Sequence, residues 1–256
     1  MPNSRWAAPG TRPALLGPWI KLPSPMSVEA MFAAGADFVC IDMCNGWLSI
    51  DRVADLLAHA AQPGPRLVRL AAGSPTSTAG QVLDAGADGI VLPHVNSVDD
   101  ARHAVAAALF PPDGTRGMGS TGRAGRWGLV TTGDYLATGR LDGAPPFISV
   151  MIETAESVRQ AAELAKIDGV SQLLIGTADL GLDLGHDTAL LDDAADEVLR
   201  ACLPARVSAG IAVGRPEDAL RYVRRGFDMV YISNDLTLLA RSAQACFAAA
   251  RTEPGA

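Results

Sequence analysis

The sequence predicts a (β/α)8 TIM barrel in one domain, and three observations support this prediction. Apolar runs of strand length alternate with helical patterns eight times between residues 17 and 251. The runs are almost continuously apolar, which is typical of parallel strands buried on both faces. A helix ending in Gly with Asp shortly after it precedes three of the runs, at residues 34–37, 85–88 and 226–228. A doubly wound open sheet is the competing architecture, but no G-x-G-x-x-G follows the first run.

Each predicted element has a local signal at its ends. The first strand stops at Pro23, and the helix after it stops at Gly35, because proline and glycine end regular structure. The predicted strands cover residues 18–22, 36–42, 66–70, 89–95, 147–152, the run that begins at Leu173, 207–213 and 229–233. The predicted helices cover residues 27–35, 51–61, 78–85, 97–109, 157–167, 189–203, 216–225 and 236–251.

The domain boundaries follow from this repeat. Residues 1–16 are predicted to be an N-terminal arm, residues 17–251 the barrel, and residues 252–256 a C-terminal tail. The pattern lapses between Phe110 and Pro146. A connection this long in a compact domain is usually functional or disordered, and its Trp and Arg residues favour a loop that covers the carboxyl ends of the strands.

Composition narrows the classes of function. Hydrophobic residues make up 48% and charged residues 19% of the chain, which suffices for a large core. The formal charge of −7 and the absence of a long Lys/Arg cluster exclude an electrostatic nucleic-acid footprint. No signal peptide or membrane span is predicted. The four cysteines show neither disulfide nor zinc spacing, so a cytoplasmic location is expected.

Two carboxylates are the main candidates for chemistry. Glu153 and Asp179 each end an apolar run, on consecutive predicted strands. If the strands are parallel neighbours, the carboxylates converge at one end of the barrel and can hold a hard divalent cation. A helix cap is the structural alternative for either residue alone. The turn Gly176-Thr177-Ala178 offers backbone N–H groups for a small anion, so the sequence indicates chemistry on a small carboxylic acid.

Other polar residues at predicted strand ends have two interpretations each. Arg69 lies in an apolar strand, where it either fastens the barrel to a carboxylate or stabilises negative charge on a substrate. Asp42 is left open as a ligand, an orienting group or a cap. His94 is more often structural than a base in such a position. Asp84, by itself, is typical of a solvated helix residue.

The chain resembles the HpcH/HpaI family of metal-dependent pyruvate aldolases. The motifs that carry the resemblance span nearly the whole barrel and are Gly17-Pro18-Trp19, Ala34-Gly35-Ala36-Asp37, Ile41-Asp42-Met43, Gln81–Gly86, Phe110–Gly117, Ile152-Glu153-Thr154 and Ile175–Leu180.

The resemblance implies a barrel, usually hexameric, with its last helix exchanged between subunits. It implies a Mg²⁺, Mn²⁺ or Co²⁺ ion held by Glu153 and Asp179, with pyruvate chelating the metal. It further implies that Arg69 stabilises the metal-bound enolate, and that substrate is bound by Trp19 and by the stretch Gly176, Thr177, Ala178 and Asp179. Both lysines, Lys21 and Lys166, are predicted to lie away from the inner strand ends, so no Schiff base is expected.

The sequence departs from the family pattern at the base. The family usually has histidine after the second strand, paired with an aspartate that matches Asp84. Here the stretch is Asp42-Met43-Cys44-Asn45-Gly46, and an asparagine side chain does not take up a proton near neutral pH. Asn45, Asp84 and His94 are therefore the residues to test for the acid–base step. Thr177 stands where proline is usual.

These features favour a carbon–carbon lyase. The expected reaction is cleavage of a 4-hydroxy-2-oxo acid to pyruvate and an aldehyde, or the reverse addition, in a homo-oligomer. The alternatives are oxaloacetate decarboxylation, condensations like those of citrate-forming siderophore enzymes or macrophomate synthase, and a barrel that binds 2-oxo acids without turnover. Retention of Arg69, Glu153 and Asp179 favours catalysis over binding alone.

Overall fold

The chain folds as a closed barrel of eight parallel strands in sequential order, as predicted. The computed structural model describes residues 13–59, 64–74, 76–138 and 144–251. The strands are β1 (Leu15–Ile20), β2 (Val39–Asp42), β3 (Arg66–Arg69), β4 (Gly89–Leu92), β5 (Phe147–Ile152), β6 (Gln172–Gly176), β7 (Ser208–Val213) and β8 (Met229–Asn234). β1 begins two residues before the predicted start of the barrel at Gly17, and residues 1–12 and 252–256 lie outside the described residues.

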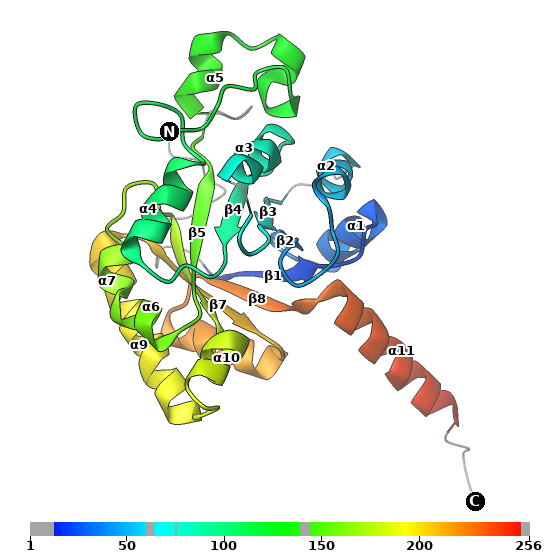
Figure 1. Ribbon diagram of the computed structural model, residues 1–256. Helices are drawn as coiled ribbons and strands as arrows, with labels where there is room; N and C mark the ends of the chain where they lie inside the picture. Colours follow the sequence, from blue (N-terminus) through cyan, green and yellow to red (C-terminus); the bar gives the residue numbers. More distant parts are fainter. Residues whose placement is uncertain (1–12, 60–63, 75, 139–143, 252–256) are drawn as a thin grey trace, which may run out of the picture.

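Helices surround the strands (Figure 1). Those that follow the predicted repeat are α1 (Pro25–Ala33), α2 (Ile50–His59), α3 (Thr76–Asp84), α4 (Val98–Ala106), α6 (Ala155–Arg159), α7 (Ala161–Leu164), α9 (Thr188–Ala205), α10 (Pro216–Arg225) and α11 (Asp235–Arg251). The structure adds the short elements η1 (Arg123–Gly128), α5 (Thr132–Thr138) and α8 (Thr177–Asp183), which the apolar periodicity did not indicate. None of the described helices is long and apolar enough to cross a membrane.

Side-chain alternation along the strands divides the core into two parts. Val39 and Ile41 of β2 pack outward into the layer between strands and helices, whereas Cys40 packs inside the barrel. The inner cluster comprises Trp19, Phe38, Cys40, Leu67, Val91, Phe147, Met151, Leu174, Met229 and Tyr231. Because successive side chains point to opposite faces, residues two positions beyond an inner residue also face inward. This alternation brings the side chains at the carboxyl ends of the strands together.

The connection between α4 and β5 packs elsewhere than predicted. Helices of a βα unit run back toward the amino ends of the strands, and the connection packs on the last residue of α3, Asp84, through Arg116 and Tyr135. The described residues of this segment contribute nothing to the lining of the cavity at the opposite end. The expectation that the segment covers the carboxyl ends of the strands is therefore wrong within one chain.

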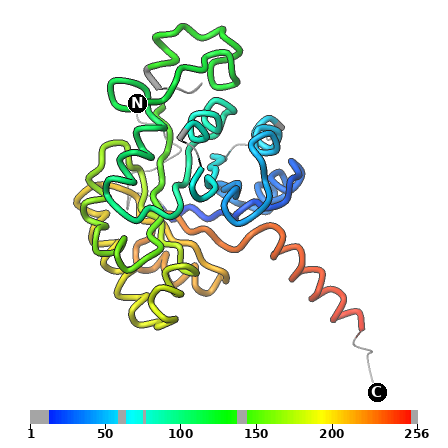
Figure 2. Tube along the Cα trace, in the orientation of Figure 1, coloured from blue at the N-terminus to red at the C-terminus, as the bar shows by residue number. Residues whose placement is uncertain are grey.

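The last helix leaves the barrel. α11 begins at the end of β8 and projects away from the other elements, as both views of the chain show (Figures 1 and 2). Several of its large apolar side chains are exposed, among them Leu239 at 60% and Phe247 at 59%. A helix with this much exposed apolar surface lacks a partner within its own chain.

Candidate active site

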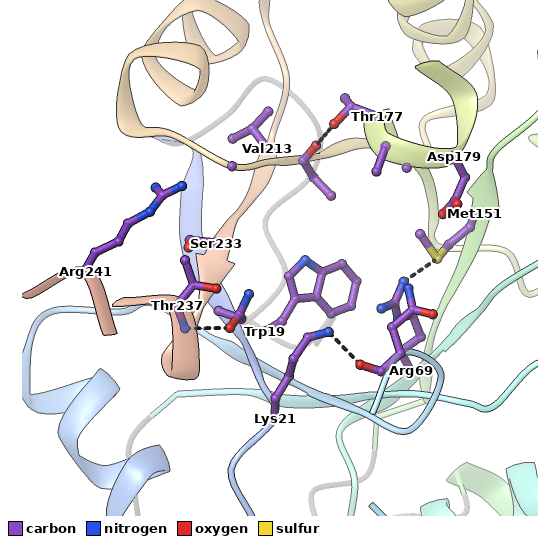
Figure 3. Close-up of a pocket in the computed structure, with 16 residues that line it drawn as sticks. Trp19, Lys21, Arg69, Met151, Thr177, Asp179, Val213, Ser233, Thr237 and Arg241 are labelled. Carbon is purple, nitrogen blue, oxygen red and sulfur yellow. Dashed lines mark hydrogen bonds between the residues drawn. The ribbon is translucent and has the colours of Figure 1, made fainter. Parts of the chain in front are cut away.

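A cavity of about 350 Å³ opens at the carboxyl ends of the strands. Figure 3 shows the side chains around it. The strand ends, the loop after β2, the start of α8 and the β8–α11 junction all contribute to the lining. The lining residues are Trp19, Lys21, Asn45, Arg69, Met151, Gly176, Thr177, Ala178, Asp179, Ala212, Val213, Gly214, Ser233, Asn234, Thr237 and Arg241. The six predicted substrate-contacting and base-position residues Trp19, Asn45, Gly176, Thr177, Ala178 and Asp179 are all among them, as is Arg69.

Arg69 and Asp42 form a buried ion pair at one wall of the cavity. They are the last residues of β3 and β2 and are direct partners in the strand register. Arg69 donates from Nε to Oδ1 of Asp42 at 2.8 Å and from Nη2 to Oδ2 at 2.7 Å. Its guanidinium carbon lies 4.3 Å from the ring centroid of Trp19, and its Nη1 lies 3.9 Å from the sulfur of Met151. These contacts leave Arg69 in a fixed position beside the cavity.

The ion pair moves the pKa of both partners. Burial alone would raise the pKa of the Asp42 carboxyl, but hydrogen bonds and charge from Arg69, with help from the backbone of Asn45 and the charge of Lys21, lower it. Burial alone would lower the pKa of Arg69, and Asp42 raises it instead. Both groups are therefore charged at neutral pH. Because Asp42 is fully engaged with neighbouring residues, its structural role as the anchor of Arg69 is the interpretation that the contacts favour.

Glu153 and Asp179 come together from consecutive strands but not at equivalent positions. Glu153 follows β5 directly, whereas Asp179 lies in the first turn of α8, three residues past the end of β6. Burial raises the pKa of Glu153, and the negative charge of Asp179 adds to this shift, although the backbone N–H of His94 and the charge of Arg69 oppose it. A buried carboxylate with a second carboxylate beside it is a site that a cation stabilises.

Gly176 allows Glu153 to approach α8. A Cβ atom at position 176 would lie 2.9 Å from Cγ of Glu153 and 3.1 Å from Cε of Met151. Both distances are shorter than an ordinary contact, so the glycine is required for this packing. Thr177, the first residue of α8, donates from its hydroxyl to the backbone oxygen of Ala212 at 2.6 Å. The hydroxyl thus ties α8 to β7 at the cavity wall, where Thr177 and Ala212 both line the space.

His94 contributes its backbone rather than its side chain to this arrangement. Its N–H donates to Oε2 of Glu153 at 2.7 Å, and its φ of 53° is in the left-handed region that only a few non-glycine residues adopt. Its side chain is exposed and lines a different cavity, of about 330 Å³, near the ends of β3 and β4. The structure therefore assigns His94 an orienting contact, and a role as base remains a prediction.

Asp84 lies outside the cavity of its own chain. Its Oδ1 accepts hydrogen bonds from Nη2 of Arg116 and from the hydroxyl of Tyr135, each at 2.6 Å. Burial and this hydrogen bond to Asp84 raise the pKa of Tyr135 to about 12. The expectation of a solvated helix residue is wrong, because Asp84 is half-buried and holds the α4–β5 connection against α3. Its pairing with the base position stays a prediction.

Lys21 is the residue that the sequence placed wrongly. It follows the last residue of β1, lines the cavity, and donates from Nζ to the backbone oxygen of Asn45 at 2.6 Å (Figure 3). Side-chain alternation along β1 could have predicted this position, because Lys21 lies two residues after Trp19 and so faces inward as Trp19 does. Four polar residues from the β8–α11 junction were also missed, since helix periodicity says nothing about a cavity at a helix start: Ser233, Asn234, Thr237 and Arg241.

Comparisons with known proteins identify the family of this chain. Residues 15–242 match the HpcH/HpaI aldolase/citrate lyase family. The chain belongs to this family. A 4-hydroxy-2-oxo-heptane-1,7-dioate aldolase of Salmonella paratyphi A is 34% identical over 236 residues, which cover 90% of this chain and 88% of the relative. The predicted membership of an HpcH/HpaI family of carbon–carbon lyases is thereby confirmed.

Solved structures of the HpcH/HpaI family share the barrel. A family protein from Burkholderia cenocepacia J2315 superimposes with a TM-score of 0.85 at 32% identity, over 93% of this chain and 95% of that one. The HpcH/HpaI aldolase from Desulfitobacterium hafniense DCB-2 has a TM-score of 0.85 at 24% identity, over 94% of each chain, and so shares the fold.

Proposed function

We propose that the chain is a metal-dependent carbon–carbon lyase that cleaves a 4-hydroxy-2-oxo acid to pyruvate and an aldehyde, or catalyses the reverse addition. The observation that carries the proposal is the meeting of Asp179 and Arg69 at one cavity, with Glu153 buried beside Asp179. Asp179 and Arg69 line a space of substrate size, and Glu153 lies next to Asp179, which supports the proposal. The relatives named as aldolases support the same reaction class.

The two carboxylates suit a divalent cation. One oxygen of Glu153 accepts from the backbone of His94, which fixes the side chain, and burial disfavours its charged form without a cation. The described residues contain no group of three or more potential ligands among His, Cys, Asp and Glu. Glu153 and Asp179 would therefore hold a Mg²⁺, Mn²⁺ or Co²⁺ ion that keeps positions open for oxygen atoms of a substrate. Such an ion polarises a ketone, so that a neighbouring carbon can carry negative charge.

The protein groups around the cavity have complementary tasks. The positive charge of Arg69 faces the space where a ketone oxygen gains negative charge, and Asp42 and Trp19 hold it there before the reaction. The backbone of residues 176–179 would bind the substrate carboxylate. Trp19 would bound the carbon chain of the substrate. A preorganised cation of this kind stabilises a transition state more than a mobile one.

One observation favours a second reaction. No described side chain that lines the cavity is an imidazole, and Asn45 does not take up a proton. Retro-aldol cleavage needs a base for the hydroxyl group of the substrate, whereas decarboxylation of oxaloacetate begins without one. Oxaloacetate decarboxylation, or a condensation that uses the same carbanion, is therefore the alternative activity.

The assembly and location are proposed as well. Exposed apolar side chains on α11 support a homo-oligomer, trimeric or hexameric, in which this helix packs on another copy of the chain. The ligands are small molecules, a 2-oxo acid and an aldehyde. All four cysteines are unpaired, which supports a cytoplasmic location. Light scattering at several concentrations would measure the assembly, and a monomer at all of them would contradict it.

Proton exchange tests the proposed function. Pyruvate would be followed by NMR in D₂O with the protein and Mg²⁺ or Mn²⁺, and oxaloacetate loss would be followed in parallel. Methyl deuteration of pyruvate is the result expected for the lyase. Loss of oxaloacetate without pyruvate exchange would support the second reaction. Binding of either acid with neither reaction would overturn both and favour a barrel without turnover.

A further inference from the structure

Lys21 places an amine at the cavity, and the proposed reaction does not yet include a role for it. Its Nζ lies 2.6 Å from the backbone oxygen of Asn45 and 3.3 Å from Oδ2 of Asp42. The side chain is 24% exposed, so it is neither buried nor free in solvent. Figure 3 shows the chain of Lys21 extending along the cavity between Trp19 and Arg69. This position is within reach of a small molecule that fills the cavity.

Charged groups face Lys21 from every neighbouring element. Asp42 at the end of β2 is shared between Lys21 and Arg69, so that one carboxylate serves two cations at this wall. The carboxylate of Asp235, at the start of α11, accepts from the backbone N–H of Lys21 at 2.9 Å rather than from Nζ. The remaining charged groups of the cavity lining are Asp179 on α8 and Arg241 on α11. The charged groups around Lys21 thus include both signs in equal number: Lys21, Arg69 and Arg241 are cations, and Asp42, Asp179 and Asp235 are anions.

Few of the described lining residues can transfer a proton. Guanidinium groups keep theirs, which excludes Arg69 and Arg241. The amide of Asn45 is excluded for the same chemical reason. Asp179 is engaged as the proposed ligand of a cation. Lys21 is the remaining nitrogen acid in the lining, and lysine amines do act as acids and bases in enzymes.

We propose that Lys21 is the catalytic acid of this site and gives its proton to the substrate carbon that has lost a carboxylate or an aldehyde. This inference rests on the proposed function. In decarboxylation, the bond from C3 to the carboxylate breaks, CO₂ leaves, and the electron pair stays on the C2–C3 fragment as an enolate. That pair then forms a C3–H bond with a proton of Nζ, the N–H bond breaks, and the amine regains a proton from water. The products are pyruvate and CO₂, and no oxidant is needed.

A structural role is the competing explanation. The bond from Nζ to Asn45 could simply hold the loop after β2, and the charge of Lys21 could simply offset Asp42. The substitution Lys21→Arg distinguishes the structural role from that of a catalytic acid. Arginine keeps the charge and can reach the same acceptors, but it does not release a proton. Methionine removes both charge and proton. Lys166 provides a matched control, since its amine pairs with Glu163 on the surface and is 65% exposed.

The experiment compares Lys21→Arg, Lys21→Met and Lys166→Met with the wild type in Mn²⁺-dependent oxaloacetate decarboxylation from neutral to alkaline pH. Loss of a catalytic acid should lower kcat about 100-fold or more in both Lys21 variants. It should also remove the fall in rate at alkaline pH that is expected of the wild type. KM should change by less than about threefold, because the lost step follows binding. Lys166→Met should match the wild type.

A further variant protects the test against misfolding. Lys21→Ala should recover activity when methylammonium is added, and its thermal unfolding should resemble that of the wild type. Activity of Lys21→Arg within about twofold of the wild type, with the same alkaline fall in rate, would overturn the assignment of Lys21 and leave the lyase standing. A wild type that turns over neither oxaloacetate nor a 4-hydroxy-2-oxo acid would overturn both. Absence of rescue by methylammonium in a folded Lys21→Ala protein would also count against the acid.

Discussion

The guanidinium of Arg69 binds both carboxylate oxygens of Asp42, across two strands whose last residues are partners in the barrel register. The side chain of Asp42 is fully buried and that of Arg69 is 7% exposed. A bidentate pair with this little solvent contact fixes the direction of the cation. A change to this pair should therefore alter both the stability of the barrel and the charge at the cavity wall.

Asp42→Asn should destabilise the protein and abolish turnover. The substitution leaves the buried Arg69 without a counter-charge, and breaking such a pair typically costs about 3–5 kcal/mol of unfolding free energy. Urea unfolding at neutral pH measures this loss. Asp218→Asn, which removes an exposed pair with Arg215, is the control and should cost less than about 1 kcal/mol. Equal losses for the two variants would contradict the buried pair.

The same pair predicts a dependence of stability on acid. Arg69 and its neighbours lower the pKa of Asp42 against the effect of burial, so the folded state binds this proton less readily than the unfolded chain. The stability that the ion pair contributes is therefore present above the ordinary pKa of aspartate. It is lost as the pH falls through the lowered pKa that Asp42 has in the folded state. The wild type should lose stability over this acidic range more steeply than Asp42→Asn. Parallel curves for the two proteins would show that Asp42 is not the responsible group.

Glu153→Gln should stabilise the metal-free protein at neutral pH. Burial, with a contribution from Asp179, raises the pKa of Glu153, so the native state holds this proton more tightly than the unfolded chain. The resulting destabilisation grows as the pH rises from the ordinary pKa of glutamate through the raised one, and glutamine removes it. Thermal unfolding with a chelator should show a higher Tm for the variant.

Added Mn²⁺ should give the wild type a higher Tm than Glu153→Gln, the reverse of the order without metal. A ligand that binds only the folded state stabilises it, and the variant lacks half of the proposed carboxylate pair. Glu156→Gln, at an exposed position three residues further on, is the control and should respond to Mn²⁺ as the wild type does. An equal Mn²⁺-induced rise in Tm for Glu153→Gln and the wild type would remove Glu153 from the metal site.

Asn45→His should raise retro-aldol activity toward a 4-hydroxy-2-oxo acid. Position 45 lines the cavity, and an imidazole there can take the hydroxyl proton that asparagine does not accept. A coupled assay for pyruvate measures the gain. Asn96→His, on an exposed loop position, controls for the added imidazole itself. Absence of a gain would show that the cavity has been rebuilt around another acid–base group.

Tyr135→Phe should weaken the packing of the α4–β5 connection. The substitution removes one of the two hydrogen bonds to Oδ1 of Asp84, with an expected cost of about 1–2 kcal/mol. Burial and Asp84 raise the pKa of Tyr135 to about 12. The stability that this hydrogen bond contributes is therefore fully present below the ordinary pKa of tyrosine, and it is lost as the pH rises from there toward 12. Urea unfolding measures the cost. Tyr222→Phe is the control, since no described hydrogen bond depends on its hydroxyl.

The sequence predicted the barrel well because its signal is local and repeated. Each strand is an apolar run buried on both faces, and each helix ends near a Gly or Pro, so the order of elements follows from short stretches such as Val39–Asp42. The inward direction of Trp19, Arg69 and Asp179 followed from strand ends and from the family resemblance. Lys21 was missed because the strand was interpreted without its alternation. Thr177 was expected in a loop, since a helix as short as α8 leaves little periodicity.

Contacts between distant segments could not be predicted in the same way. Asp84 carries no sign in its own helix that Arg116 and Tyr135 reach it from residues 32 and 51 positions away. The backbone N–H of His94 that fixes Glu153 is equally invisible, because main-chain donors have no residue type. The start of α11 became part of the cavity only through closure of the barrel between β8 and β1.

The packing of Glu153 against the start of α8 depends on the absence of a Cβ atom at position 176. A methyl group at position 176 would lie 2.9 Å from Cγ of Glu153 and 3.1 Å from Cε of Met151, so both side chains would have to shift. A residue without a functional group thereby limits where the side chain of Glu153, and so its negative charge, can lie. Chemistry here is tuned by shape at 176 as much as by the identity of the acids.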